Sequence, residues 1–308
     1  MECSRFGSMR TLPFSQGRGK RAGSSEIGRS SPLPQPEKAI PVFAGHVYGN
    51  RVTRGTIAAG VHVGERQRII ELNGARNLRD VGGYPTSDGQ RQTRWRTRYR
   101  SACLDELHET GQQWLIEAGL RTIIDLRDSQ EVAERPSVFA GSNQLRYVRI
   151  PFYDGPPPDD FTPDLHRGYR RELDELGEHL VRLVETLLAP GTLPALIHCA
   201  AGKDRTGVAI GVLLAAVGIR IDIIAQDYAL SEQCLGPDNV RTAREWVLRR
   251  GYSWAVWEHV THSPPERMLY TLAYLDEQYG GVEQYLVKHG LAKSKLIDIR
   301  ELLTEPAW

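Results

Sequence analysis

Apolar residues divide the chain into short extended segments and longer helical ones. Continuous apolar runs at 120–126, 145–150 and 195–197 are typical of buried strands. Residues 112–118 are predicted to be helical. Between 165 and 187 the apolar residues recur every three or four positions, which predicts a single helix with one apolar face. The residues of that face are Leu165, Tyr169, Leu173, Leu176, Leu180, Leu183, Val184 and Leu187.

The second half of the chain is predicted to be almost wholly helical. An apolar run without proline at 208–218 is followed by helical patterns at 221–231, 238–250, 264–279 and 282–289. Strands that alternate with helices and then give way to a helical C-terminal part predict an α/β fold. We expect a central sheet flanked by helices.

Residues 77–100 are predicted to be extended segments joined by a turn-rich link at 85–89. Arg94, Arg96, Arg98 and Arg100 alternate with other residues and would share one face of a strand. Such a stripe fits either a solvated sheet edge or a basic surface that binds an anionic substrate or supports an active site. Arg100 is the strongest candidate for the second role.

The N-terminal part differs from the rest in composition and charge. Residues 1–41 are rich in Ser, Gly, Arg and Pro and are predicted to be a disordered basic tail, and 42–65 are a linker or an added strand. The folded domain is expected at 66–308. Residues 1–64 carry a net charge of +6, against −5 for 65–308. The tail lacks the apolar run of a secretory signal, so we expect no export, no membrane insertion and a cytoplasmic location.

The four cysteines, Cys3, Cys103, Cys199 and Cys234, show no paired spacing of a disulfide framework or a zinc site. A reducing compartment is therefore expected, and no metal, cofactor or nucleic-acid partner is predicted. The oligomeric state stays open.

Residues 198–207 read His-Cys-Ala-Ala-Gly-Lys-Asp-Arg-Thr-Gly, between a predicted strand and a predicted helix. Backbone N–H groups and the positive end of the helix converge on such a loop, which predicts a phosphate-binding site. Arg205 would add a two-pronged contact to the phosphate oxygens. The predicted substrate-binding residues are Ala200, Ala201, Gly202, Lys203, Asp204 and Arg205.

Cys199 is the predicted nucleophile of this loop. A thiol at a helix N-terminus beside an arginine ionises more readily than a free one, and attack of the thiolate on phosphorus would form a phosphocysteine. Thr206 could donate its hydroxyl to the departing thiolate. The alternative is a buried structural cysteine. Because Gly202, Arg205 and Thr206 also stand where one mechanism needs them, the catalytic interpretation is favoured.

The loop matches the signature His-Cys-x5-Arg-Ser/Thr, and the chain resembles the cysteine-dependent protein tyrosine phosphatase superfamily. More narrowly, it is similar to the bacterial and fungal branch whose loop reads His-Cys-x-x-Gly-Lys-Asp-Arg-Thr. The resemblance covers about residues 66–304. Further similar segments are 77–84, 99–101, 122–127 with Glu131 and Pro136, Asp227-Tyr228 and 279–281. It implies hydrolysis of phosphomonoesters without metal, on phosphotyrosine, in some members on phosphoserine or phosphothreonine, and in several on phosphoinositides.

A general acid must protonate the leaving oxygen, and the sequence leaves three candidates. Asp204 is favoured, since the resembling branch carries an aspartate there. Asp125 is the second, with fixing Arg127 or the loop as its alternative role. The third is the Pro- and Gly-rich segment 154–160. His198 is expected to hold the loop and tune the thiolate.

Lys203 could reach a second phosphate of the substrate or pair with a carboxylate such as Asp204. Three functions therefore stay open. The first is a phosphatase of proteins that carry phosphotyrosine, with or without activity on phosphoserine or phosphothreonine. The others are a phosphoinositide or inositol phosphate phosphatase and an inactive phosphate-binding module. The intact loop argues against the third. The net negative charge of 65–308 argues against binding to an anionic membrane.

Overall fold

The computed structural model describes residues 66–153, 165–249 and 251–307. The predicted tail at 1–41, the segment 42–65 and the candidate acid segment at 154–160 lie outside the described residues.

A five-stranded sheet forms the centre of the fold, in the order β1-β3-β6-β4-β5. Its strands are β1 (Arg79–Asp80), β3 (Arg98–Ser101), β4 (Thr122–Asp125), β5 (Arg146–Arg149) and β6 (Ala195–His198). All except the antiparallel β1 run parallel. The last residues of β3, β6 and β4, which are Ser101, His198 and Asp125, lie side by side in register. The predicted α/β architecture is confirmed, and so is the placement of Cys199 and Asp125 at the carboxyl ends of strands.

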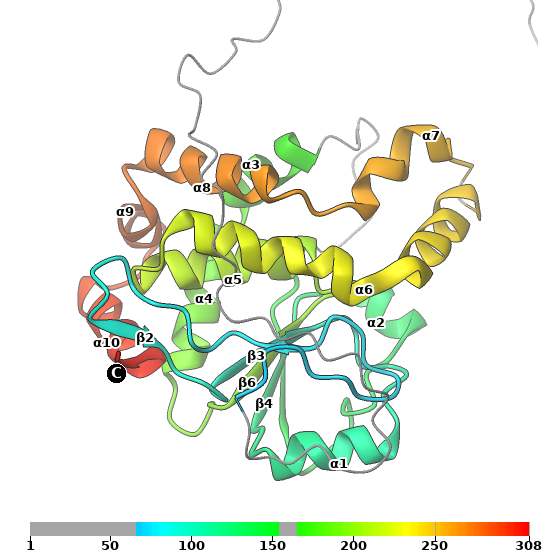
Figure 1. Cartoon of the computed structure of the whole chain (residues 1–308), viewed down its shortest axis with the longest axis horizontal. Coiled ribbons are helices and arrows are strands. Elements are labelled where there is room, and N and C mark those ends of the chain that lie inside the picture. The colour runs from blue at the N-terminus through cyan, green and yellow to red at the C-terminus, as the bar shows by residue number, and fades with distance from the viewer. Residues whose placement is uncertain (1–65, 154–164, 250, 308) are drawn as a thin grey trace, which may run out of the picture. The chain divides into compact units, whose positions relative to one another are not determined.

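The buried strands contribute side chains to two hydrophobic cores, because successive side chains of a strand point to opposite faces of the sheet. Ile123 and Leu196 pack on the side of α1 (Glu109–Glu117), whereas Ile124 and Ile197 pack on the side of α4 (Gly177–Leu188) and α5 (Asp204–Ala216). Figure 1 shows α1 below the sheet and α4 and α5 on its other face.

The C-terminal part is helical, as predicted, but it contains helices that the pattern did not indicate. Its helices are α6 (Ile221–Arg249), α7 (Trp254–Trp257), the 3-10 helix η1 (Glu258–Thr261), α8 (Pro265–Tyr279), α9 (Val282–Lys288) and α10 (Lys293–Leu303). Helices α7, η1 and α10 were not predicted. The chain then forms β7 (Thr304–Pro306), which pairs with β2 (Arg91–Thr93), more than 200 residues away in the sequence.

Two helix predictions are wrong in their boundaries. The single helix expected over 165–187 is two helices, α3 (Leu165–Glu175) and α4, because Leu176 leaves the helical conformation at φ −109° and ψ 15°. The separate helices expected at 221–231 and 238–250 are one element, α6, with a kink at Gly236. A short helix α2 (Ser129–Glu134) was also missed.

The predicted arginine stripe is also wrong as a single strand. The link at 85–89 does join antiparallel segments, since the Thr86 N–H donates to the Arg91 carbonyl at 2.8 Å. Beyond it, however, Arg94 and Arg96 precede β3, and Arg96 lies in the left-handed region at φ 56°. Arg98 and Arg100 are buried. The stripe is therefore not a solvated edge at those two positions.

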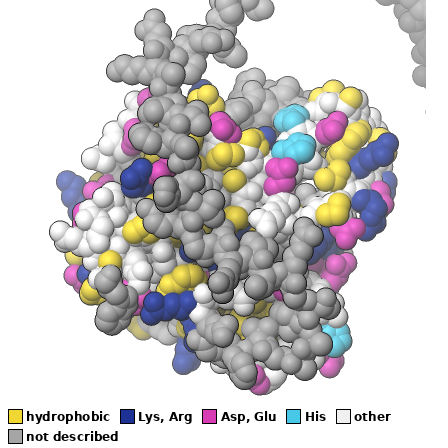
Figure 2. Space-filling view, viewed as in Figure 1, with side chains coloured by type: hydrophobic (Ala, Val, Ile, Leu, Met, Phe, Trp, Pro, Cys, Tyr) yellow, Lys and Arg dark blue, Asp and Glu magenta, His cyan; other side chains and the backbone are white. Residues whose placement is uncertain are grey.

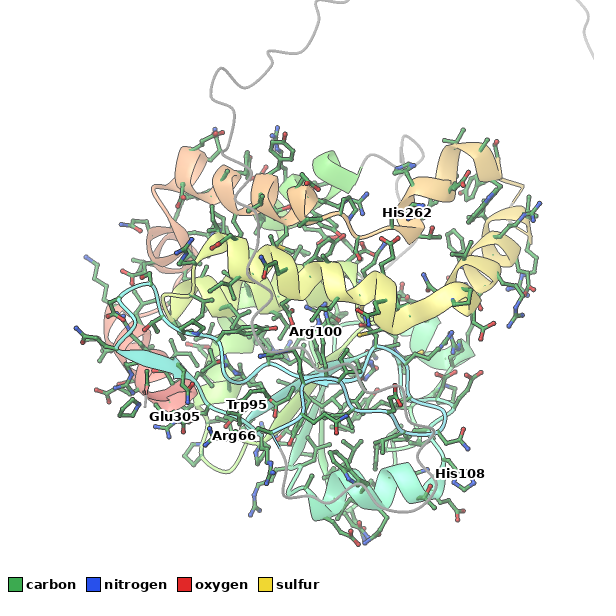
Figure 3. The ribbon with its side chains drawn as sticks, viewed as in Figure 1. Arg66, Trp95, Arg100, His108, His262 and Glu305 are labelled. Atoms are coloured by element: carbon green, nitrogen blue, oxygen red, sulfur yellow. The ribbon has the colours of Figure 1, made fainter. Side chains whose placement is uncertain are left out.

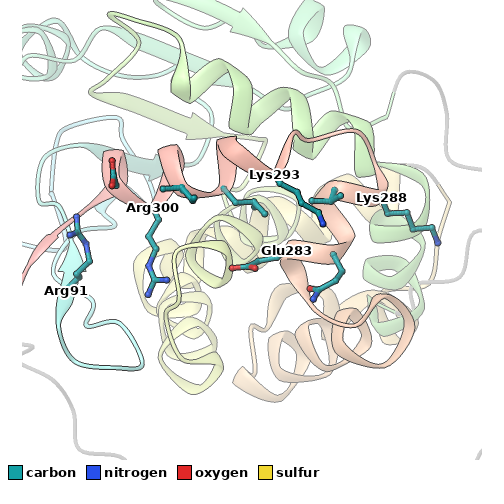
Figure 4. Close-up of a pocket in the computed structure, with 10 residues that line it drawn as sticks. Arg91, Glu283, Lys288, Lys293 and Arg300 are labelled. Atoms are coloured by element: carbon teal, nitrogen blue, oxygen red, sulfur yellow. The ribbon is translucent and has the colours of Figure 1, made fainter.

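Two surface features lie outside the phosphate loop. A pocket of about 800 Å³ is lined by residues of β2, α9 and α10, among them Arg91, Lys288, Lys293 and Arg300 (Figure 4). Exposed apolar side chains, including Leu248, Tyr252 and Val256, gather at the end of the molecule formed by α6 and α7, where Figure 2 shows hydrophobic side chains next to Lys and Arg.

Candidate active site

The loop 199–203 joins the end of β6 directly to the start of α5. Its tightest point is Gly202, which has φ +66° and approaches β3 so closely that a Cβ atom would lie 2.0 Å from the Ser101 carbonyl oxygen. Only glycine fits there without moving the backbone. Cys199, the first residue of the loop, is 2% exposed.

Side chains from the N-terminal part of the fold bind the carbonyls of this loop. Asn77 Nδ2 donates to the carbonyls of Ala201 and Gly202 at 2.9 and 3.0 Å, and Arg100 Nη2 donates to the Gly202 carbonyl at 2.7 Å. A carbonyl and the N–H of the same peptide unit point in opposite directions. These contacts therefore leave loop N–H groups to face away from Asn77 and Arg100.

A buried carboxylate, Asp227 of α6, in turn fixes the arginines that support the loop. It accepts from Arg100 Nη1 at 2.6 Å, from Arg79 Nε at 3.2 Å and from the Tyr84 hydroxyl at 2.9 Å. Burial opposes its ionisation, but Arg79 and Arg100 outweigh it and hold the pKa of Asp227 well below its usual range. Arg79 also contacts Asn77. Figure 3 shows Arg100 between the sheet and α6.

This arrangement gives a physical role to segments that the sequence identified only by their resemblance to the family. Asn77, Arg79 and Tyr84 belong to the segment 77–84, Arg100 to 99–101 and Asp227 to the pair at 227–228. Their roles could not be read from local patterns, since the partners are separated by more than 100 residues. Of the arginine stripe, Arg100 supports the loop, as the sequence suggested.

Arg205, in the first turn of α5, forms a bidentate ion pair with Glu131 of α2. Its Nη1 and Nη2 donate to the two Glu131 oxygens at 2.6 and 2.7 Å. Glu131 itself is fixed by a reciprocal cap with Asp128 at the start of α2. Burial disfavours the charge of Arg205, but the Glu131 pair outweighs it and keeps the pKa of Arg205 well above its usual value. Glu131 was missed as a site residue, although it stood within a resembling segment.

Asp125 is fully buried and ion-paired. Both of its oxygens accept from Arg127, the shortest contact being 2.7 Å, and it also accepts from the Tyr147 hydroxyl. Burial works against ionisation, yet the charge of Arg127 and these hydrogen bonds outweigh it and lower the pKa of Asp125 to about 2. These contacts correspond to the alternative role, fixing Arg127, and an ionised carboxylate has no proton to donate.

His198 lies beside this pair at the end of β6. Its Nε2 is 3.8 Å from an Asp125 oxygen, and its Nδ1 is 3.1 Å from the Cys199 carbonyl oxygen. Burial lowers the pKa of His198, which favours the neutral ring. A neutral ring bonded to the backbone next to the nucleophile is suited to holding the loop.

Asp204 opens α5 and is the most accessible of the described acid candidates, with a third of its side chain exposed. It accepts from the Tyr169 hydroxyl of α3. That hydroxyl is 2.9 Å from the hydroxyl of Tyr228, which accepts from Arg267 Nη1 at 3.2 Å. The carboxyl is thus oriented by a chain of hydrogen bonds and still reaches solvent.

Lys203 connects the loop to the segment before α8. Its buried ammonium donates to the carbonyls of Val260 and His262, the latter at 3.1 Å, and lies 3.5 Å from Asp204. Burial lowers the pKa of Lys203. Thr206 is fully buried, and among the described residues its hydroxyl has no hydrogen-bond partner. It is therefore free to donate to a neighbouring sulfur.

A buried thiol between a parallel strand and a helix, with an arginine six residues further on, is the arrangement of a cysteine-dependent phosphatase. Residues 70–305 match the sequence model of the tyrosine phosphatase family, and the chain belongs to that family. It is a cysteine-dependent protein tyrosine phosphatase.

Its relatives include the triple specificity protein phosphatase PtpB of Mycobacterium tuberculosis, which is 28% identical over 76% of this chain and 99% of its own length. A tyrosine-protein phosphatase of Nostoc commune is 26% identical over 65% of this chain and 72% of its own. Among solved structures, the Siw14 catalytic core is 16% identical, with a TM-score of 0.36 over 72% of this chain and 97% of that one. Within the described ranges, no helix has the length and apolarity to cross a membrane.

Proposed function

We propose that the chain removes phosphate from phosphotyrosine in protein substrates, with Cys199 as the nucleophile, Arg205 as the phosphate-binding cation and Asp204 as the general acid. The observation that supports this most directly is the loop itself. Its backbone is held by Asn77 and Arg100, and its first residue is the buried thiol at the end of β6. Donors fixed in advance stabilise a phosphoryl group at little cost in reorganisation.

The reaction has two displacement steps. The thiolate of Cys199 attacks phosphorus, the bond from phosphorus to the phenolic oxygen breaks, and Asp204 gives that oxygen its proton. Water then attacks the phosphocysteine, gives a proton to Asp204, and the sulfur leaves as a thiolate that accepts a hydrogen bond from Thr206. The backbone N–H groups of 200–205 stabilise the negative charge on the phosphoryl oxygens in both steps.

Glu131 supports the role of Arg205. Because the two terminal nitrogens of Arg205 each donate one hydrogen bond to Glu131, three of the five guanidinium N–H groups stay available for phosphate oxygens. Holding the guanidinium plane in place reduces the conformational entropy lost when phosphate binds.

Phosphotyrosine-containing protein is proposed as the substrate in preference to phosphoinositide. The second-phosphate role of Lys203 was the main argument for an inositide, and its ammonium donates instead to two backbone carbonyls. We further propose that 66–308 is the phosphatase domain, that the tail at 1–41 is dispensable for activity, and that the enzyme acts in the cytoplasm.

The experiment is phosphate release by the full chain, with a metal chelator present, from a phosphotyrosine peptide, a phosphoserine peptide and a soluble phosphoinositide. Cys199→Ser is the matched control, because it keeps the loop and removes the nucleophile. We expect release from the phosphotyrosine peptide and none from the variant. Preference for the phosphoinositide would overturn the substrate proposal, and turnover by Cys199→Ser would overturn the covalent mechanism.

A further inference from the structure

The face of α3 that meets the phosphate loop carries two buried polar residues one turn apart. Tyr169 is 1% exposed and donates to Asp204, and Glu172, three residues later, is 6% exposed. Residues at this spacing lie on the same side of a helix. Glu172 therefore faces the same region as the hydroxyl that orients the general acid.

Glu172 is only half satisfied by hydrogen bonds. Its Oε1 accepts from the hydroxyl of Tyr153, whose side chain is 38% exposed. Its Oε2 is buried, and the described part of the chain supplies no hydrogen-bond partner for it. An ionised oxygen left in this state would be costly, whereas a neutral carboxyl tolerates it far better.

The charged groups around Glu172 come from several elements. Asp204 and Arg205 act on it from α5, and both also act on the Tyr153 hydroxyl. Tyr169 lies on the same helix, and Arg267 of α8 connects to Tyr169 through Tyr228.

Two glutamates near Arg205 thus differ in state. Burial raises the pKa of Glu172 to about 7, whereas at Glu131 the pair with Arg205 outweighs burial and lowers the pKa. Near neutral pH, Glu131 is ionised and Glu172 is largely neutral or evenly divided between its two forms.

We propose that Glu172 is a positioning residue that works as a neutral carboxyl, holding Tyr153 beside the phosphate loop and leaving Arg205 to the substrate phosphate. Ionised Glu172 would place a second negative charge near Asp204, compete for Arg205 and repel a phosphate dianion. Substrate binding then weakens as Glu172 loses its proton. This inference rests on the proposed function.

The test is a set of KM and kcat profiles for a small aryl phosphate, for the wild type and for Glu172→Gln. The glutamine is neutral at every pH and can still accept from Tyr153. If only the neutral form permits binding, the ratio of the wild-type KM to the variant KM should rise about tenfold between about pH 6 and about pH 8. Ionisation of the substrate affects both proteins equally and cancels in this ratio. Glu175→Gln, an exposed position on the same helix, should leave the ratio flat.

Tyr153→Phe gives a second reading at a position that is partly exposed and less critical for folding. The Tyr153 hydrogen bond lowers the pKa of Glu172, so its removal should move the rise in KM to higher pH. A merely structural Glu172 would produce neither change. The proposal alone would be overturned if an active Glu172→Gln variant showed the same pH dependence of KM as the wild type. It would also be overturned if the rise of KM with pH in Tyr153→Phe occurred at the same pH as in the wild type. A wild type without phosphatase activity would instead overturn the proposed function.

Discussion

The phosphate loop is held in two different ways on its two sides. Towards β1, β3 and α6, buried side chains donate to its backbone carbonyls, and behind them Arg100 pairs with Asp227, each of these two side chains being 1% exposed. Towards α2 and α3, the contacts go to the charged side chains of Arg205 and Asp204. There Glu131 and Asp204 are 28% and 33% exposed.

The difference separates shape from chemistry. Backbone carbonyls bound by buried arginines fix where the loop N–H groups point, and a buried pair is expensive to disturb. Partly exposed side chains can exchange partners when a substrate arrives, at a cost of about 1 kcal/mol or less per pair. Damage to the first side should therefore unfold the site, and damage to the second should change the reaction.

The largest effect is expected for Asp227→Asn. It leaves Arg79 and Arg100 buried without their carboxylate, and breaking a buried pair in this way lowers the free energy of unfolding by about 3–5 kcal/mol. Urea denaturation measures it. Asp222→Asn, which breaks the exposed pair with Arg220, is the control and should cost less than about 1 kcal/mol. Equal costs for the two variants would contradict the proposed division.

Asp204→Asn tests the other side. Loss of the general acid should reduce kcat for a poor leaving group such as phenol by about 100-fold, with a smaller loss for an activated phenol. The free energy of unfolding should change little, because Asp204 is partly exposed. If Asp125→Asn shows this selectivity instead, the assignment of the acid is wrong; leaving-group series with both variants distinguish the two.

Acid should destabilise the fold through its buried, ion-paired carboxylates. The pKa of Asp125 is about 2 in the fold, below the ordinary value of 3.8, and that of Asp227 is also lowered. A depressed carboxyl pKa adds stability above the unfolded value, and that stability is lost as the pH falls through the folded one. We expect about 2 kcal/mol from Asp125 to disappear between about pH 4 and about pH 2, measured by denaturation at each pH. A flat profile in this window would contradict the paired state.

The smallest effect is expected for Tyr169→Phe, which removes one hydrogen bond to Asp204 and keeps the ring. A hydrogen bond of this kind is worth about 0.5–1.5 kcal/mol, so kcat for poor leaving groups should fall about twofold to tenfold. Tyr228→Phe, one step further from the carboxyl, is the matched control and should have less effect. If the control slows the reaction more, Tyr169 does not orient the acid.

Much of the site follows from its sequence, because its central residues are neighbours. Cys199, Gly202 and Arg205 lie within seven positions between an apolar strand and an apolar helix. Local spacing was sufficient to predict the phosphate loop and its place at the carboxyl ends of the strands. Glu131 and Asp227 carried no such signal, since a carboxylate in a helix is most often solvated. The break at Leu176 was hidden for a similar reason, because the apolar spacing continues across it.

The sequence by itself determined the α/β alternation, the nucleophilic loop and the family resemblance. All three are read from the order and spacing of residues within short segments. The tertiary structure decided which arginines are buried, where Lys203 donates and which carboxylates pair with which arginines. These outcomes depend on segments more than 50 residues apart. The charge state of a carboxyl follows its burial and its partners, and both are properties of the folded chain.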